Sequence, residues 1–177
     1  MKSTKVAVRY AKALLEISIE NKSIDAVLGD MQFLSKTINE SHEFELLIAS
    51  PIVSSSKKLD IFEKVFSSFE KISMSFIRLI TKNGREFYLP SIAASFEAQV
   101  KAHRGIVPMT ITSAVALDDT TKKQIIAKVQ ATIAGQLEIE EKIDESLIGG
   151  FVVRMGDTQI DASVLSQFNN LKQRLTR

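Results

Sequence analysis

Four acidic residues in the C-terminal part of the sequence are the first candidates for catalytic chemistry. Asp144, Glu145, Asp157 and Asp161 could bind a divalent cation or supply the acid and base of glycoside hydrolysis. Their spacing fits neither an EF-hand loop nor another dedicated metal loop. They also fall at predicted strand ends and turns, where Asp commonly caps or turns the chain. We therefore expect structural roles, and keep a hydrolase that uses Asp144, Asp157 and Asp161 as the enzyme alternative.

Two further motifs fit structural roles better than chemical ones. Gly149-Gly150 follows Leu147-Ile148, but no Gly-Lys-Ser/Thr follows and the next element is a predicted strand rather than a helix, so a phosphate loop is not indicated. These glycines instead predict a turn or bulge with close backbone packing. His42 and His103 lie far apart in the sequence, and neither is paired with a nucleophile.

The charges argue against a nucleic-acid-binding protein. The 23 basic and 21 acidic residues give a net charge of +2, which is too balanced for a chain that binds the phosphate backbone. No predicted helix gathers Arg, Lys, Asn and Gln on one face at its N-terminus, as reading a DNA groove would require. We expect the pairs Lys57-Lys58 and Lys122-Lys123 to lie on solvated helix faces.

The composition excludes several kinds of chemistry. With no Cys, the chain has no disulfide, thiolate zinc site, iron–sulfur cluster or Cys nucleophile. Its longest uncharged run, residues 105–117, is shorter than the roughly 20 residues of a membrane-spanning helix. We expect any role at a membrane to work through partners. The few Gly (7) and Pro (3) residues favour a helix-rich fold.

Apolar residues at helical spacing predict six helices in the first part of the chain. They cover residues 4–21, 24–38, 42–49, a segment capped by residues 54–56, residues 70–83, and a segment from Pro90 to about residue 103. The first helix carries two apolar stripes, where one would suffice to dock it. The stripes are Val6, Tyr10, Ala13, Leu14 and Ile17, and Val8, Ala11, Leu15 and Ile19. Two stripes indicate central burial or a second partner.

The apolar pattern changes to a period of two after Gly105. Strands are predicted over residues 107–112, 137–143 and 151–153, and Gly156-Asp157 predicts a hairpin into residues 158–161. Pro108 indicates an edge strand or the first part of a strand. Helices are predicted after residues 118–120 and over residues 165–175. The expected fold class is α+β, with an all-α six-helix bundle over residues 1–105 and a small α+β domain over residues 106–177.

Several motifs resemble one family. Residues 143–157, IDESLIGGFVVRMGD, resemble the signature of the ATP synthase delta subunit family, which includes the mitochondrial oligomycin-sensitivity-conferring protein. Residues 160–163, 9–14 and 83–85 fit the same family, as do the length and the order of a helix bundle before an α+β domain. The resemblance covers essentially the whole chain.

The resemblance implies a non-catalytic stator subunit without a cofactor or a metal. In this family the N-terminal bundle lies on the alpha/beta catalytic head. The N-terminal segment of an alpha subunit binds there as a helix, in a groove between the first and fifth helices. The C-terminal domain holds the C-terminal ends of the b subunits of the peripheral stalk. One copy per complex keeps the head from turning with the rotor, so that proton flow drives ATP synthesis. No nucleic acid takes part, and the membrane is reached only through the complex.

This role gives specific residues and a location. For the alpha-subunit groove we expect Tyr10, Ala13, Phe76, Leu79 and Asn83. For the peripheral stalk we expect Phe151, Val153, Phe168 and Leu171. Because no transit peptide is recognisable, we expect a bacterial protein or a plastid-encoded copy. For the bacterial case, the expected location is peripheral, on the cytoplasmic face of the plasma membrane. The alternative is a helical adaptor for another amphipathic helix.

Overall fold

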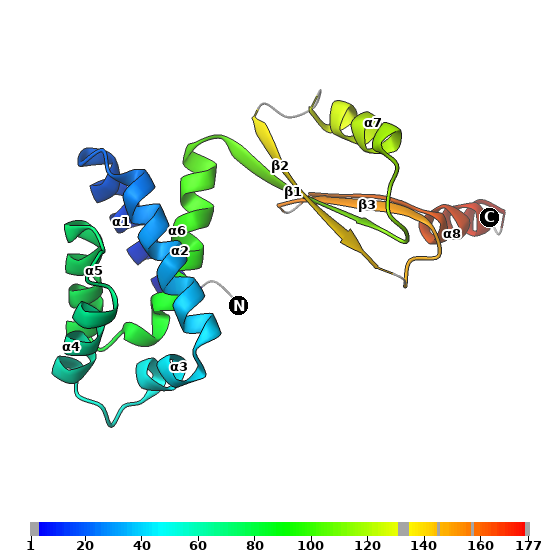
Figure 1. Ribbon diagram of the computed structural model, residues 1–177. Coiled ribbons are helices and arrows are strands. Elements are labelled where there is room, and N and C mark those ends of the chain that lie inside the picture. Colours follow the sequence, from blue (N-terminus) through cyan, green and yellow to red (C-terminus); the bar gives the residue numbers. More distant parts are fainter. Residues whose placement is uncertain (1–3, 131–134, 145, 157, 176–177) are drawn as a thin grey trace. The chain divides into compact units, whose positions relative to one another are not determined.

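The computed structural model describes residues 4–130, 135–144, 146–156 and 158–175 (Figure 1). The chain forms two compact units, Met1–Lys101 and Ala102–Arg177. Helices make up the first unit, and a four-stranded sheet with two helices makes up the second. The expected α+β fold class, with a helical bundle before a small α+β part, is confirmed.

Six α-helices and one short 3-10 helix form the first part of the fold. Their bounds are α1 Lys5–Glu20, α2 Ile24–Glu40, α3 His42–Ala49, α4 Ser55–Val65, α5 Lys71–Lys82, η1 Glu86–Tyr88 and α6 Leu89–His103. Each predicted helix is present within a few residues of its predicted bounds, whereas η1 was not predicted.

Capping side chains begin two of these helices. Thr4 precedes α1, and its hydroxyl oxygen accepts a hydrogen bond from the Ala7 N–H at 3.2 Å. Ser41 does the same for α3, accepting from the Phe44 N–H at 3.3 Å. These bonds satisfy N–H groups that have no partner within the helix. Ser23 stands at the corresponding position before α2, but its side chain makes no capping bond.

Asn83-Gly84 ends α5 as predicted. Gly84 adopts a φ of +63°, a left-handed conformation that Gly reaches without steric strain. The Gly84 N–H donates to the Thr81 carbonyl and the Arg85 N–H donates to the Ile80 carbonyl, both at 3.0 Å. This pair of bonds is a Schellman motif, and it turns the chain sharply toward η1.

The buried face of α1 lies between the two stripes that the sequence shows. It consists of small and apolar side chains, namely Ala7, Ala11, Leu14, Leu15 and Ser18. Each stripe also has side chains that stay partly exposed, Ile17 in the first stripe and Val8 in the second. The small residues let neighbouring helices pack closely against α1, which is therefore central to the bundle and still presents apolar side chains on its flanks.

Lys58 corrects one prediction. The sequence places it on a solvated helix face, but only 2% of Lys58 is exposed. Its ammonium lies 2.6 Å from a carboxylate oxygen of Glu86 and donates to the Ile48 carbonyl oxygen at 3.1 Å. The bonds join α4 to α3 and to η1. A partner 28 residues away, in a 3-10 helix that the sequence did not predict, makes this burial favourable.

The second unit is a mixed sheet in the order β2-β1-β3-β4. Its elements are β1 Ile106–Ser113, α7 Asp119–Gln130, β2 Gln136–Ile143, β3 Gly150–Met155, β4 Thr158–Ser163 and α8 Val164–Leu175. β1 pairs with β2 in parallel and with β3 antiparallel. Ile125 and Val129 of α7 form a small core with Met109, Ile111 and other residues of the sheet.

Pro108 lies in the first part of β1, as the sequence allows, but β1 is a central strand rather than an edge. Its pairing with β3 begins one residue later, at Met109 opposite Met155. On its other side Pro108 is opposite Glu138 of β2. The missing N–H is tolerated because it falls before the strand becomes paired on both sides.

Candidate functional site

An apolar groove between α1 and α5 is the site most suited to a protein partner. Its volume is about 290 Å³, and Leu14, Ile17, Lys71, Ile72, Ser75, Phe76 and Leu79 line it. Leu14 and Phe76 are buried, whereas Leu79 is 51% exposed and Ile17 is nearly half exposed. Apolar side chains from two neighbouring helices thus line a groove that an amphipathic helix can occupy.

Tyr10 lies beside Phe76 and also contacts Arg85. The rings of Tyr10 and Phe76 meet edge to face, with their centroids 6.4 Å apart. The Arg85 guanidinium donates to the Tyr10 hydroxyl oxygen at 2.9 Å, and its carbon lies 5.6 Å from the centre of the same ring. These contacts hold α1 to the turn that follows α5 and fix the tyrosine ring in place.

The structure brings together part of the residue set expected for the alpha-subunit groove. Phe76 and Leu79 line the groove, and Tyr10 contacts Phe76. Ala13 is exposed on α1, and Asn83 is the exposed C-cap of α5. Neither of these two is among the lining residues.

Sequence reasoning missed five lining residues, all close to those it chose. They are Leu14, Ile17, Lys71, Ile72 and Ser75. Leu14 and Ile17 belong to the same stripe as Tyr10, and Ile72 precedes Phe76 by one helical turn. Extending both apolar stripes by one turn toward the end of α1 and the start of α5 would have found Leu14, Ile17 and Ile72, whereas the polar Lys71 and Ser75 give no such signal.

The residues expected at the peripheral stalk fall into different environments. Val153 is 1% exposed and Phe151 is partly buried, and both belong to the core of the second unit. Phe168 on α8 is 71% exposed, and Val164 and Leu165 beside it are also exposed. The side chain of Leu171 lies outside the described residues. The first two turns of α8 therefore carry an exposed apolar surface.

The candidate carboxylates hold turns of the backbone. Asp144 accepts from the Ser146 N–H at 2.9 Å. Asp161 accepts from the Ser163 N–H at 2.8 Å and from the Ser166 hydroxyl at 2.6 Å. The hydrogen bonds from Ser146 lower the pKa of Asp144, and those from Ser166 and Ser163 lower the pKa of Asp161. A lowered pKa disfavours a role as general acid. Glu145 and Asp157 lie outside the described residues.

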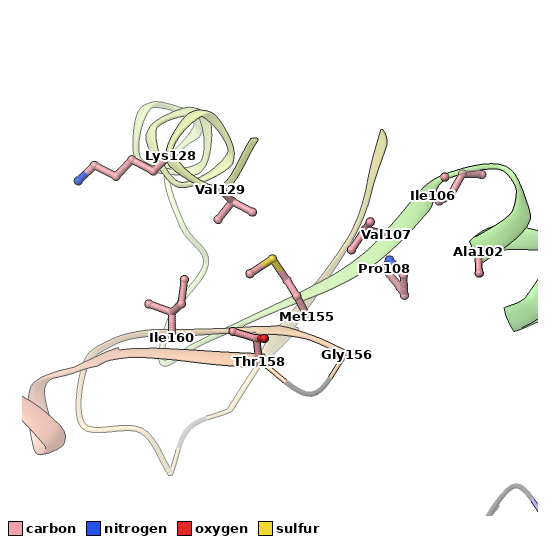
Figure 2. Close-up of a pocket in the computed structure, with 11 residues that line it drawn as sticks. Ala102, Ile106, Val107, Pro108, Lys128, Val129, Met155, Gly156, Thr158 and Ile160 are labelled. Carbon is pink, nitrogen blue, oxygen red and sulfur yellow. The ribbon is translucent and has the colours of Figure 1, made fainter. Parts of the chain in front are cut away.

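A larger hollow lies within the second unit (Figure 2). Its volume is about 860 Å³, and its lining includes Val107, Pro108, Val129, Met155 and Ile160. Figure 2 shows the Lys128 ammonium directed away from these apolar side chains. The described lining contains no carboxylate or imidazole, so it offers no acid–base pair.

Within the described residues, no group of three or more His, Cys, Asp or Glu side chains could hold a metal ion. Over the same part of the chain, no helix has the length and apolar character to cross a membrane.

Together the fold and the groove define a two-unit α+β protein with open apolar helix surfaces, the kind of surface that binds other protein chains. The family model described as "ATP synthase delta (OSCP) subunit" matches residues 6–175. The chain therefore belongs to this family, and the resemblance seen in the sequence is confirmed.

Relatives agree with this family, and one solved structure shares the fold. An ATP synthase subunit delta from Cytophaga hutchinsonii is 34% identical over 177 residues, 99% of this chain and 97% of that one. The same subunit from Flavobacterium psychrophilum is 32% identical, covering 99% of each. A chain in the Toxoplasma gondii mitochondrial ATP synthase hexamer has a TM-score of 0.74 at 24% identity, covering 98% of this chain and 99% of that chain, and so shares the fold.

Proposed function

We propose that this chain is a non-catalytic stator subunit of a rotary ATP synthase. It joins the alpha/beta catalytic head to the b subunits of the peripheral stalk. The observation that carries the proposal is the open apolar groove between α1 and α5. Relatives that match nearly the whole chain are named ATP synthase subunit delta.

The groove suits the N-terminal segment of an alpha subunit, bound as an amphipathic helix. Ile72, Phe76 and Leu79 form one wall over about 10 Å, since an α-helix rises about 1.5 Å per residue. A partner helix can place apolar side chains from two successive turns along this length. The residues that we propose for this contact are the expected set together with the apolar lining residues, namely Tyr10, Ala13, Leu14, Ile17, Ile72, Phe76, Leu79 and Asn83.

The groove can supply only part of a tight contact. Full burial of a Leu or Ile side chain contributes about 1.5–3 kcal/mol, so the half-exposed Ile17 and Leu79 contribute about 1 kcal/mol each. A nanomolar complex corresponds to about −12 kcal/mol. The apolar anchors of the partner helix, inserted between these side chains, must therefore supply the larger share.

The second unit is the proposed attachment to the stalk. Val164, Leu165 and Phe168 give α8 an exposed apolar face that can pack against the C-terminal ends of the b subunits. We place Leu171 on the same helix. Phe151 and Val153 stay in the proposed set of stalk residues, although both belong to the core of the unit. One copy of the chain would thus connect the two parts of the enzyme on the cytoplasmic face of a bacterial plasma membrane.

The test is a calorimetric titration of the full chain with a synthetic N-terminal segment of the alpha subunit from the same organism, with helicity followed in parallel. We expect binding with a gain of helix. Leu79→Glu should weaken binding at least about tenfold, because it removes apolar contact and puts a carboxylate at the interface.

Leu46→Glu is the matched control. Leu46 is 55% exposed on α3, away from the groove, so its substitution should leave the affinity unchanged. If neither the segment nor the intact catalytic head binds the wild-type chain, the stator proposal fails. The chain would then be an adaptor for another amphipathic helix.

A further inference from the structure

One edge of the groove carries cations that the apolar contact does not use. Lys71 lines the groove at the start of α5. Lys71 and Ser75 also line a neighbouring hollow beside Glu63 and Arg78, so they form the ridge along the outer edge of the groove. Lys82 is seven residues after Ser75, two helical turns along the same ridge. The α5 edge thus carries an ammonium at each end.

The arginine between these two lysines is already paired. Arg78 contacts the Glu63 carboxylate at 2.7 Å and donates to it through Nε at 2.9 Å. Neither Lys71 nor Lys82 has an ion-pair partner within the described ranges. The positive charge that remains for a ligand therefore lies at the two ends of the edge, about 16 Å apart at a rise of about 1.5 Å per residue.

The α1 edge differs in charge. Lys12 and Glu16 lie 4.0 Å apart on this helix, and Ala13 between them is neutral. The two sides of the groove are therefore electrostatically unequal, with the cationic side on α5. Charge complementarity at the rim of an interface selects partners and sets their register more than it adds affinity.

From these observations we infer that the groove selects an amphipathic helix with acidic residues along one side of its apolar stripe, the side that faces α5. Two of its carboxylates, about 11 residues apart, would face Lys71 and Lys82. This inference rests on the proposed function, and it names the chemistry of the occupant. A helix edged by Lys or Arg would place like charges against α5.

The experiment uses the full chain and three synthetic helices that share one apolar stripe. The residues beside this apolar stripe, on the side that faces α5, are Glu in the first helix, Gln in the second and Lys in the third. At low salt we expect the Glu-edged helix to bind most tightly and the Lys-edged helix most weakly. Two exposed ion pairs should separate the Glu and Gln helices by about three- to tenfold, and added salt should reduce this difference.

The double variant Lys71→Glu/Lys82→Glu should reverse that order. Lys57→Glu is the matched control, because Lys57 is an exposed cation on α4 away from the groove, and it should preserve the order. Equal binding of the three helices, or an unchanged order in the double variant, overturns the inference.

The alpha-subunit segment separates the two failures. If the segment binds and Leu79→Glu weakens it while the three helices bind alike, the groove function stands and only the acidic edge is wrong. If neither the segment nor any of the three helices binds, the proposed function and the inference fail together.

Discussion

The buried ion pair between Lys58 and Glu86 gives the sharpest prediction about the helical unit. The Lys58 ammonium makes two contacts, one to the Glu86 carboxylate at 2.6 Å and one to the Ile48 carbonyl at 3.1 Å. Lys58→Met keeps the unbranched side chain to within one atom of its length and removes the charge. The substitution leaves the Glu86 carboxylate buried beside an apolar group and leaves the Ile48 carbonyl without this donor.

The expected loss follows from burial. Removing one partner of a buried pair costs about 3–5 kcal/mol, because the other charge is left without compensation. For a unit of this size, each 1 kcal/mol lowers the melting temperature by roughly 4–8 °C, so the helical unit should melt at least about 12 °C earlier. Thermal unfolding of the full chain, followed by helicity, measures this shift.

Two further variants make the reasoning testable. Lys36→Met removes an exposed cation 3.8 Å from Glu40 on the same helix and should change stability by no more than about 0.5 kcal/mol. The double variant Lys58→Met/Glu86→Leu replaces the pair with apolar groups and should be more stable than Lys58→Met alone. A Lys58→Met variant within about 1 kcal/mol of wild type would refute the view that this pair joins α3, α4 and η1.

The second unit yields three further predictions. Gly150→Ala should destabilise it by at least about 2 kcal/mol in denaturant titrations, since Gly150 has a φ of +79° and a Cβ would collide with the Ala162 carbonyl, whereas Gly84→Ala meets open space and should cost less. Asp161→Asn should be less stable than wild type at neutral pH. Because the pKa of Asp161 is lowered on folding, its ionised carboxylate stabilises the fold above the ordinary pKa of Asp, near 3.9. The difference in melting temperature between wild type and Asp161→Asn should therefore shrink as the pH falls through the folded pKa. Phe168→Ala should hardly change the melting temperature yet weaken binding to a C-terminal segment of the b subunit, and equal binding would count against the α8 surface.

Much of the fold could be predicted from local sequence signals. Apolar spacing located each helix, and Asn83-Gly84 located the end of α5 because a left-handed residue is needed there. The prediction of a turn with close packing at Gly149-Gly150 is also confirmed, because the Gly150 backbone lies against β4. Each of these features depends on neighbours within a few residues.

Features that depend on distant contacts were not accessible in the same way. The ion pair of Lys58 joins residues far apart in the sequence, and a lysine on an otherwise polar helix face gives no sign of its partner. The central position of β1 depends on the pairing of β3, which no residue of β1 encodes by itself. For the groove, the sequence predicted Phe76 and Leu79 but could not say where along α1 the groove lies, which decides that Ile17 rather than Ala13 lines it.

The most direct test of the proposed link is to mix the full chain with the isolated catalytic head and the soluble part of the b subunits, and to measure the mass of what forms. The account predicts one complex that contains all three components and a single copy of this chain. Leu79→Glu should release the head while the stalk stays bound. Competition between head and stalk for the chain, or failure of either to bind, would contradict a subunit that joins the two.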